Sequence, residues 1–254
     1  MELLQAAKKG RVINDRRTYF MNLLLCNVRS VWKLGRAVIN ITENNKKERQ
    51  FCQMINKMQK FWDQRYAANE TVFGAKPNKF FQLFIDLHKP GTLLLPAEGE
   101  GRNAIYAAQK GWQVDAFDFS EVAREKALDL AKGERVTINY ELKDITDFKA
   151  TKQYDAVALI YVHLPEKLRR QFHQEVFNSI KPGGFLVLEA FAKEQAELES
   201  GGPKDMNLLY DAPSLCNDFQ FLHIMNCEQK ELILEEGEYH KGKSAVLRLI
   251  GQRL

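Results

Sequence analysis

The chain has 254 residues, of which 45% are hydrophobic, and a formal net charge of +4 at pH 7. This composition is that of a globular protein with a real core, and it excludes a disordered or fibrous chain. No uncharged apolar run reaches the roughly 20 residues of a membrane span, and Met1 is followed by Glu2 rather than by the basic start of a signal peptide. The four cysteines are scattered without the close pairs of a zinc or disulfide framework. We therefore expect a cytoplasmic protein with no metal site.

Charge divides the chain into two unlike parts. Residues 1–57 hold twelve Lys or Arg against four Asp or Glu, so their net charge is +8 and that of the remainder is −4. The basic part has no sustained helical or alternating period. We expect a basic N-terminal extension over residues 1–57 and a single folded domain over residues 58–254. Because that domain is net acidic, its charge argues against a nucleic-acid partner.

Within the domain, strand-like and helix-like segments alternate at the spacing of βαβ units. Residues 93–95 form a fully apolar run, as expected for a parallel strand covered on both faces. A glycine loop follows, then a helix over residues 102–110 that Gly111 ends, and a second strand over residues 112–117. Ser120 is placed to cap the next helix.

The alternation continues and then changes in kind. Further strands are expected at residues 136–142, 154–160 and 185–191. Three more strand-like runs close the chain, at residues 219–225, 228–234 and 244–250. Short turns between these last runs indicate antiparallel additions to one sheet edge. The whole pattern predicts an α/β, Rossmann-like fold with a mostly parallel seven-stranded sheet, helices on both faces and an antiparallel C-terminal edge.

The loop after the first strand indicates a nucleotide-like ligand. Gly99 and Gly101 fit a dinucleotide-binding spacing, and Asp118 follows about 20 residues on, where a ribose-binding acid belongs. A dinucleotide would place its pyrophosphate at the helix N-terminus, where Glu98 and Glu100 would repel it. S-adenosylmethionine (SAM) has no phosphate and carries a sulfonium and an ammonium group. The loop therefore favours SAM, with an NAD(P)-dependent oxidoreductase as the alternative.

Several motifs of the sequence resemble those of one known protein family. They are Trp62-Asp63-x-Arg65-Tyr66, Gly99-Glu100-Gly101-Arg102-Asn103, Asp118-Phe119-Ser120, Lys181-Pro182-Gly183-Gly184 and Glu236-Gly237-Glu238-Tyr239-His240-Lys241. Over residues 58–254 the chain resembles class I SAM-dependent methyltransferases, in particular the tellurite-resistance-type family that methylates small molecules. It departs from the superfamily at Leu95 and Ala97, where an acid and a glycine are usual.

The resemblance implies a cofactor site in which Asp118 binds the ribose hydroxyls and Phe119 flanks the adenine. Asp144 is open to two interpretations, a contact to the adenine amino group or a helix N-cap. The full set of implied cofactor residues is Trp62, Tyr66, Ala97, Glu98, Gly99, Gly101, Arg102, Asn103, Asp118, Phe119, Asp144, Ile145 and Ile160.

The resemblance also implies a methyl acceptor that is a small nucleophile, such as a metalloid oxyanion or a thiol. This acceptor would attack the methyl carbon of SAM in line with the leaving sulfur. His240 and Lys241 lie in a motif similar to one that contacts the oxyanion acceptor in that family, and His163 follows the fourth strand, where acceptor contacts fall. A non-enzymatic SAM-binding partner protein is a further alternative. The sequence leaves open whether the protein is a monomer or a homodimer.

Overall fold

The computed structural model describes residues 56–254, of which residues 59–254 form one compact unit. The expected extension over residues 1–57 lies, but for its last two residues, outside the described part. The strands are β1 (Thr92–Pro96), β2 (Gln113–Asp118), β3 (Asn139–Leu142), β4 (Tyr154–Ile160), β5 (Ile180–Phe191), β6 (His223–Glu235) and β7 (Lys241–Gln252). The α-helices are α3 (Lys79–Leu87), α4 (Arg102–Gln109), α5 (Glu121–Gly133), α6 (Glu166–Asn178) and α7 (Ala212–Asp218). Short 3-10 turns lie at η1 (Ile145–Asp147), η2 (Lys193–Glu197) and η3 (Met206–Leu208), and residues 59–68 are helical.

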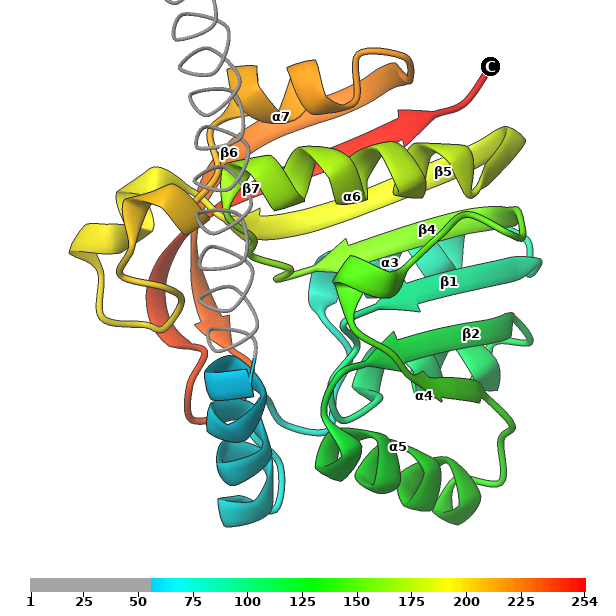
Figure 1. Ribbon diagram of the computed structural model, residues 1–254, viewed down its shortest axis with the longest axis vertical. Helices are drawn as coiled ribbons and strands as arrows, with labels where there is room; N and C mark the ends of the chain where they lie inside the picture. The colour runs from blue at the N-terminus through cyan, green and yellow to red at the C-terminus, as the bar shows by residue number, and fades with distance from the viewer. Residues whose placement is uncertain (1–55) are drawn as a thin grey trace, which may run out of the picture. The chain divides into compact units, whose positions relative to one another are not determined.

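The seven strands form one sheet in the order β3-β2-β1-β4-β5-β7-β6 (Figure 1). The first five strands along the chain pair in parallel, whereas β7 pairs antiparallel with both β5 and β6. The strand order reverses at β1, which pairs with β2 on one side and β4 on the other. In such sheets the ligand binds beyond the carboxyl ends of the strands at this reversal. In Figure 1 these ends point toward the helix of residues 59–68 and the segment of residues 192–210. The predicted fold class is confirmed.

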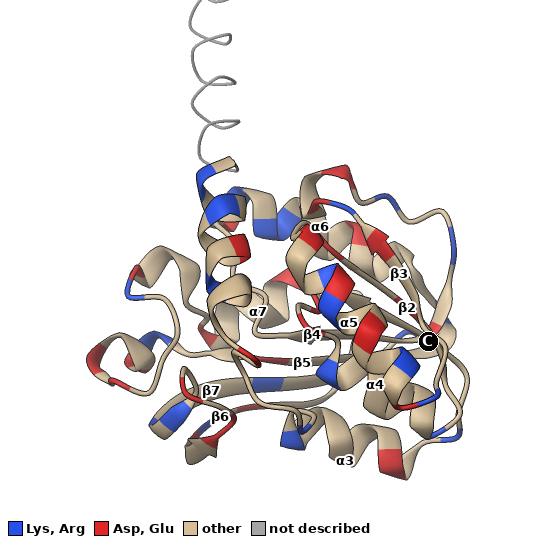
Figure 2. Ribbon diagram, turned by 90° about the horizontal axis from the view of Figure 1, so that it is seen from below, with Lys and Arg blue, Asp and Glu red and all other residues tan. Residues whose placement is uncertain are grey.

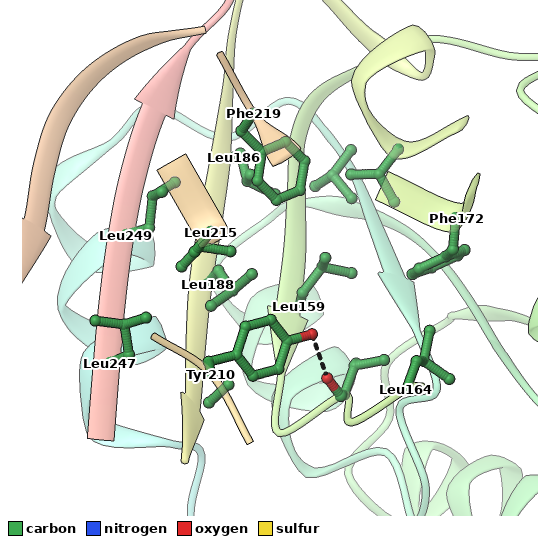
Figure 3. Close-up of a cluster of buried hydrophobic side chains, with 14 of the residues drawn as sticks. Leu159, Leu164, Phe172, Leu186, Leu188, Tyr210, Leu215, Phe219, Leu247 and Leu249 are labelled. Carbon is green, nitrogen blue, oxygen red and sulfur yellow. Dashed lines mark hydrogen bonds between the residues drawn. The ribbon is translucent and has the colours of Figure 1, made fainter. Parts of the chain in front are cut away.

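Hydrophobic side chains pack on both faces of the sheet. One cluster joins β4, β5 and β7 to α6 and α7, and a second joins β1 and β2 to α3, α4 and α5. Figure 3 shows the first cluster, in which the Tyr210 hydroxyl lies among leucines and donates a hydrogen bond to the Val162 carbonyl at 2.9 Å. Because strands with both faces covered are apolar on both faces, the short runs at β1 and β4 were readable from the sequence.

The tail differs from the prediction, because the first two of its three strand-like runs are one strand. β6 runs from His223 to Glu235 and pairs with β7, and the register shifts between Ile224 and Asn226. That bulge and the exposed polar residues after it interrupt the alternation by which the sequence signals a strand. Residues 219–222 precede the strand. The third strand, expected over residues 136–142, begins only at Asn139.

Gly101 sets how closely the loop and α4 approach α5. Its φ is 84°, and a Cβ added there would lie 2.7 Å from the Ala127 Cβ. We expect Gly101→Ala to lower the free energy of unfolding by about 1–3 kcal/mol, because overpacking and left-handed strain act together. Urea unfolding measures this loss. Gly133→Ala is the control, since nothing lies within 4 Å of a Cβ at that position; equal effects of the two changes would contradict the close approach.

Candidate active site

Three residues of the loop after β1 adopt positive φ, at Ala97 (51°), Gly99 (66°) and Gly101 (84°). The left-handed region is open to glycine but costs other residues about 1–2 kcal/mol. Ala97 therefore takes the backbone conformation that a glycine would take, although the side chain differs. The departure from the superfamily at this position leaves the shape of the loop intact.

Ala97→Gly is expected to stabilise the protein by about 1 kcal/mol, because glycine removes the cost of the left-handed φ, partly offset by its greater freedom in the unfolded chain. Urea unfolding provides the measurement. Ala108→Gly within α4 is the matched control and should destabilise by about 1 kcal/mol, the ordinary cost of glycine in a helix. A destabilising Ala97→Gly would show that the loop carries no such strain.

Glu98 caps the helix that the loop opens. Its Oε1 accepts hydrogen bonds from the backbone N–H groups of Asn103 and Ala104, both at 2.8 Å. Burial raises the pKa of this carboxyl to about 7 against these hydrogen bonds. Two of the helix N-terminal donors that would hold a pyrophosphate in a dinucleotide fold are thus already occupied by a side chain of the chain itself. This occupancy, more than simple repulsion, disfavours NAD(P).

Glu100 plays a different part from the one its sequence position indicated. Its Oε2 accepts a hydrogen bond from the Val72 N–H at 2.7 Å, and its Oε1 pairs with Lys126 at 3.0 Å. Lys126 also donates to the backbone carbonyls of Tyr66 and Asn69. Glu100 therefore ties the loop to the segment that follows the 59–68 helix, and its charge is compensated by a lysine.

Asp118, at the end of β2, lies directly beside the glycine loop. Its Oδ2 accepts from the Gly99 N–H at 3.1 Å and its Oδ1 from the Ser120 N–H at 2.9 Å. Burial raises its pKa to about 6, and the nearby Asp63 adds to the shift. Phe119 follows it, half-buried, with its carbonyl accepting from Gln59. The loop and the strand-end acid are brought together as the sequence predicted.

The helix of residues 59–68 lies against this loop. The rings of Trp62 and Tyr66 stack with centroids 5.5 Å apart. A Cβ at Gly99 would lie 2.8 Å from the Tyr66 hydroxyl, so only glycine lets the loop pass under that ring. Asp63 accepts a hydrogen bond from the Ser120 hydroxyl. Trp62 and Tyr66 thus cover the glycine loop.

Arg102 and Asn103, the first residues of α4, face the protein interior. The Arg102 guanidinium donates to Glu236 at 2.7 Å and to the carbonyls of Phe73 and Lys76. The Asn103 Oδ1 accepts from the Asn78 N–H at 2.9 Å. These donors and acceptors are engaged within the protein, so a contact from the Arg102 guanidinium to the cofactor would require it to exchange partners.

A buried polar network extends from Arg102 across the sheet. Glu236 and Glu189 both accept from the Asn78 Nδ2, at 3.1 and 2.6 Å. Glu189 also pairs with Arg248 at 2.6 Å. The two carboxylates and two guanidinium groups balance in charge, as buried ionic groups require.

Two residues at the carboxyl edge of β4 and β5 contact this network. The Tyr161 hydroxyl donates to Glu189 at 2.9 Å, and its backbone has a φ of 56°, a strained conformation for a non-glycine residue. The His240 ring is buried, with 4% of its surface exposed, and its centroid lies 4.4 Å from the rings of both Phe73 and Tyr161. Residues with a strained backbone conformation are concentrated at functional sites, so this edge is the candidate acceptor side.

The other two acceptor candidates differ from His240. His163 has both ring nitrogens engaged, Nδ1 with the Leu208 carbonyl at 2.8 Å and Nε2 with the Phe191 N–H at 3.4 Å. Burial lowers its pKa to about 4. Lys241 is exposed at the start of β7. The hydrogen bonds of His163 therefore connect three segments of the chain, whereas Lys241 lies on the surface.

The three remaining cofactor candidates follow β3 and β4. Asp144 is the N-cap of the η1 turn, where its Oδ1 accepts from the N–H and the hydroxyl of Thr146. Ile145 packs, partly buried, against the same core cluster as Ala97. Ile160 is half-buried at the end of β4. The N-cap interpretation of Asp144 is observed, and its Oδ2 has no hydrogen-bond partner among the described residues.

Comparison with known proteins finds a matching domain. A model of a methyltransferase domain matches residues 96–184, which include the glycine loop, Asp118 and Asp144. This part of the chain therefore has the sequence of a methyltransferase domain. Thiopurine S-methyltransferase of Vibrio cholerae serotype O1 is 28% identical to this methyltransferase over 162 residues, which cover 56% of this chain and 74% of that relative.

Solved structures share the fold of this methyltransferase. TehB from Haemophilus influenzae superposes with a TM-score of 0.60 at 15% identity, covering 70% of this chain and 63% of that chain. The N-methyltransferase NodS from Bradyrhizobium japonicum WM9, in complex with S-adenosyl-L-homocysteine, gives a TM-score of 0.60 at 14% identity and covers 77% of this chain and 97% of that chain. The methyltransferase thus spans less than two thirds of the TehB chain.

The residues present fit SAM as the cofactor. Asp118 is an acid beside the glycine loop, and Glu98 accepts hydrogen bonds from the helix N–H groups of Asn103 and Ala104, which a pyrophosphate would need. The sequence missed Glu189 and Tyr140, whose hydroxyl donates to the Gly99 carbonyl at 2.6 Å. An acid within the apolar strand β5 was a readable signal for Glu189, whereas nothing marked Tyr140.

Proposed function

We propose that this methyltransferase transfers the methyl group of SAM to the sulfur of a small thiol. The observation that carries the proposal is His240, a buried imidazole at the carboxyl edge of the sheet beside the rings of Phe73 and Tyr161. Burial lowers its pKa, so the ring is neutral near pH 7 and is able to accept the proton of a thiol. When bound, SAM supplies an electrophilic methyl group on its sulfonium.

The charges around His240 favour a thiol over a metalloid oxyanion. Glu236 and Glu189 are each paired with an arginine, so the network leaves no surplus positive charge, and Lys241 lies on the surface. An oxyanion needs such positive donors, whereas a thiol is neutral before it reacts. The Vibrio relative is named for methyl transfer to sulfur, which also supports a sulfur acceptor.

The cofactor roles follow from the positions of the loop and the strand ends. We assign the backbone at Gly99 and Gly101 to the methionine part of SAM, Asp118 to the ribose and Phe119 to the adenine. Asp144, through its Oδ2, and Ile145 would complete the adenine side. Trp62 and Tyr66 would cover the bound cofactor.

We assign catalysis to residues 58–254 and no catalytic part to residues 1–57. The compactness of residues 59–254 supports this division, and the described residues include no helix that is both apolar and long enough to span a bilayer. Figure 2 shows basic and acidic residues interspersed along α5, unlike the uniformly basic face that nucleic-acid binding uses. A variant that starts at residue 58 should keep methyl transfer, and loss of activity in a folded variant would contradict the division.

Radiolabelled SAM tests the acceptor class directly. The purified chain would be incubated with thiophenol, 2-mercaptoethanol, selenite or tellurite, and the methylated products separated from SAM. We expect label on the thiols in preference to the oxyanions. Transfer to selenite or tellurite alone would show that the oxyanion assignment is the right one, and the absence of transfer to every compound would contradict a small nucleophile of this kind.

A further inference from the structure

Glu236 lies between the cofactor loop and the acceptor side. It follows β6 directly, in a turn that closes when the Glu236 N–H donates to the His240 carbonyl at 2.8 Å. The turn packs on residues 73 and 74, because a Cβ at Gly237 would lie 2.7 Å from the Gly74 nitrogen. Glu236 and His240 are therefore held four residues apart in a fixed geometry.

The Glu236 side chain is buried and ionised. Although burial opposes ionisation, interactions with His240 and Arg102 lower its pKa to about 2. Its Oε2 accepts from Arg102 at 2.7 Å and its Oε1 from Asn78 at 3.1 Å. The carboxylate is therefore ionised near pH 7, and both of its oxygens accept hydrogen bonds.

The His240 ring is oriented by its neighbours. Phe73 and Tyr161 lie 4.4 Å from its centroid and Phe191 lies 5.2 Å away. Its Nδ1 is buried and has no hydrogen-bond partner among the described residues, and the Oε2 of Glu236 lies 4.0 Å from it. A buried nitrogen without a partner costs free energy, so a small ring movement toward this carboxylate is favoured.

We propose that Glu236 is a positioning residue that draws the Nδ1–H of His240 inward, so that Nε2 is the nitrogen presented to the methyl acceptor. The proposal rests on the proposed function, because it takes His240 as the group that faces the thiol. Nδ1 then carries the proton and Nε2 the lone pair. In the transfer, the thiol S–H proton moves to Nε2, a new S–CH₃ bond forms and the sulfonium C–S bond breaks.

The charged groups around His240 act in opposite directions on its protonation. Burial lowers the pKa of His240 most, and Arg102 lowers it further, whereas Glu236 and Glu189 raise it. The neighbouring His163 is held neutral by its own burial, so it adds little positive charge. Loss of the Glu236 charge should therefore lower the pKa of His240 and move the acidic limb of the rate profile to lower pH.

The Arg102 guanidinium connects the Glu236–His240 pair to the glycine loop. One guanidinium nitrogen donates a hydrogen bond to Glu236, and another donates to the backbone carbonyls of Phe73 and Lys76. Arg102 is also the first residue of α4, directly after Gly101. The same side chain therefore holds both the glycine loop and Phe73, whose ring packs on His240. The orientation of His240 is thereby tied to the loop beside which SAM binds.

The test is ¹⁵N NMR of the imidazole rings in the full chain, which reads the tautomer of His240 without any need for turnover. In the unaltered protein we expect a proton on Nδ1 and none on Nε2. In Glu236→Gln this preference should be lost. Glu189→Gln is the matched control, because it removes a carboxylate of the same network that does not approach Nδ1, and it should keep the Nδ1–H form.

Kinetics provide the second readout. With thiophenol as acceptor, Glu236→Gln should lower kcat about 10- to 100-fold and shift the acidic limb downward in pH, while KM for SAM changes little. A proton on Nε2 in the unaltered protein, or the same tautomer in Glu236→Gln, would overturn the proposal even if the variant is hard to purify. Failure of the proposed function looks different, since then no thiol is methylated although the tautomer of His240 is as expected.

Discussion

Asp118→Asn is expected to weaken the binding of S-adenosyl-L-homocysteine about 10- to 150-fold. This range corresponds to the loss of one charge-assisted hydrogen bond, worth about 1.5–3 kcal/mol. An amide also places an N–H against the backbone donors of Gly99 or Ser120 that the carboxylate now accepts from. Isothermal titration measures the change. Asp115→Asn is the control on the same strand, because Asp115 pairs with Lys152 and Tyr154 instead.

The pH dependence of binding tests the same carboxylate. Because burial raises the pKa of Asp118 to about 6, the group is ionised above that pH and neutral below it. Cofactor affinity should fall as the pH drops below about 6, by up to about tenfold per pH unit, and stay constant above it. Asp118→Asn should flatten this dependence. A ligand that binds equally well at about pH 5 and about pH 8 would mean that the ribose lies elsewhere.

Asp218→Ala is expected to lower the free energy of unfolding by about 3–5 kcal/mol, the cost of leaving a buried charge without its partner. The Asp218 side chain is fully buried and accepts from Arg169 at 2.8 Å and from His173 at 3.0 Å. Since Arg169 and His173 lie on α6 and Asp218 ends α7, the change leaves a buried guanidinium unpaired between two helices. Urea unfolding followed by circular dichroism gives the value.

Glu231→Gln is the control for that change, because its ion pair with Lys243 is well exposed on both sides. An exposed pair contributes about 0–1 kcal/mol, so this variant should unfold almost as the unaltered protein does. Equal losses for Asp218→Ala and Glu231→Gln would show that the buried ion pair between α6 and α7 does not stabilise the protein more than an exposed pair does.

The parallel part of the fold was predictable because its signals are local. Residues 156–160 are a continuous apolar run, and β4 forms over the predicted span of residues 154–160. Ser120 caps α5, with its side chain accepting a hydrogen bond from the Ala123 N–H. Strand β6 was not read as one element, because a bulge and an exposed polar stretch hide its period. The sequence signals what a segment buries, and an edge strand buries little.

The site was predictable in its loop and less so in its contacts. Gly99, Gly101 and Asp118 lie together because parallel strand ends meet at one edge. The sequence did not show which way each side chain of the loop points. Glu98 accepts a hydrogen bond from the first turn of α4, whereas Glu100 pairs with Lys126. Partners such as Arg102 and Glu236, which lie 134 positions apart in the chain, depend on the whole topology.

Calorimetric titration of the full chain with S-adenosyl-L-homocysteine and, separately, with NADH distinguishes the two cofactor classes. Glu98 occupies helix donors that a pyrophosphate needs, whereas the loop and Asp118 are suited to a ligand without phosphates. We expect S-adenosyl-L-homocysteine to bind with release of heat and NADH not to bind. Tight binding of NADH with no response to S-adenosyl-L-homocysteine would contradict this expectation.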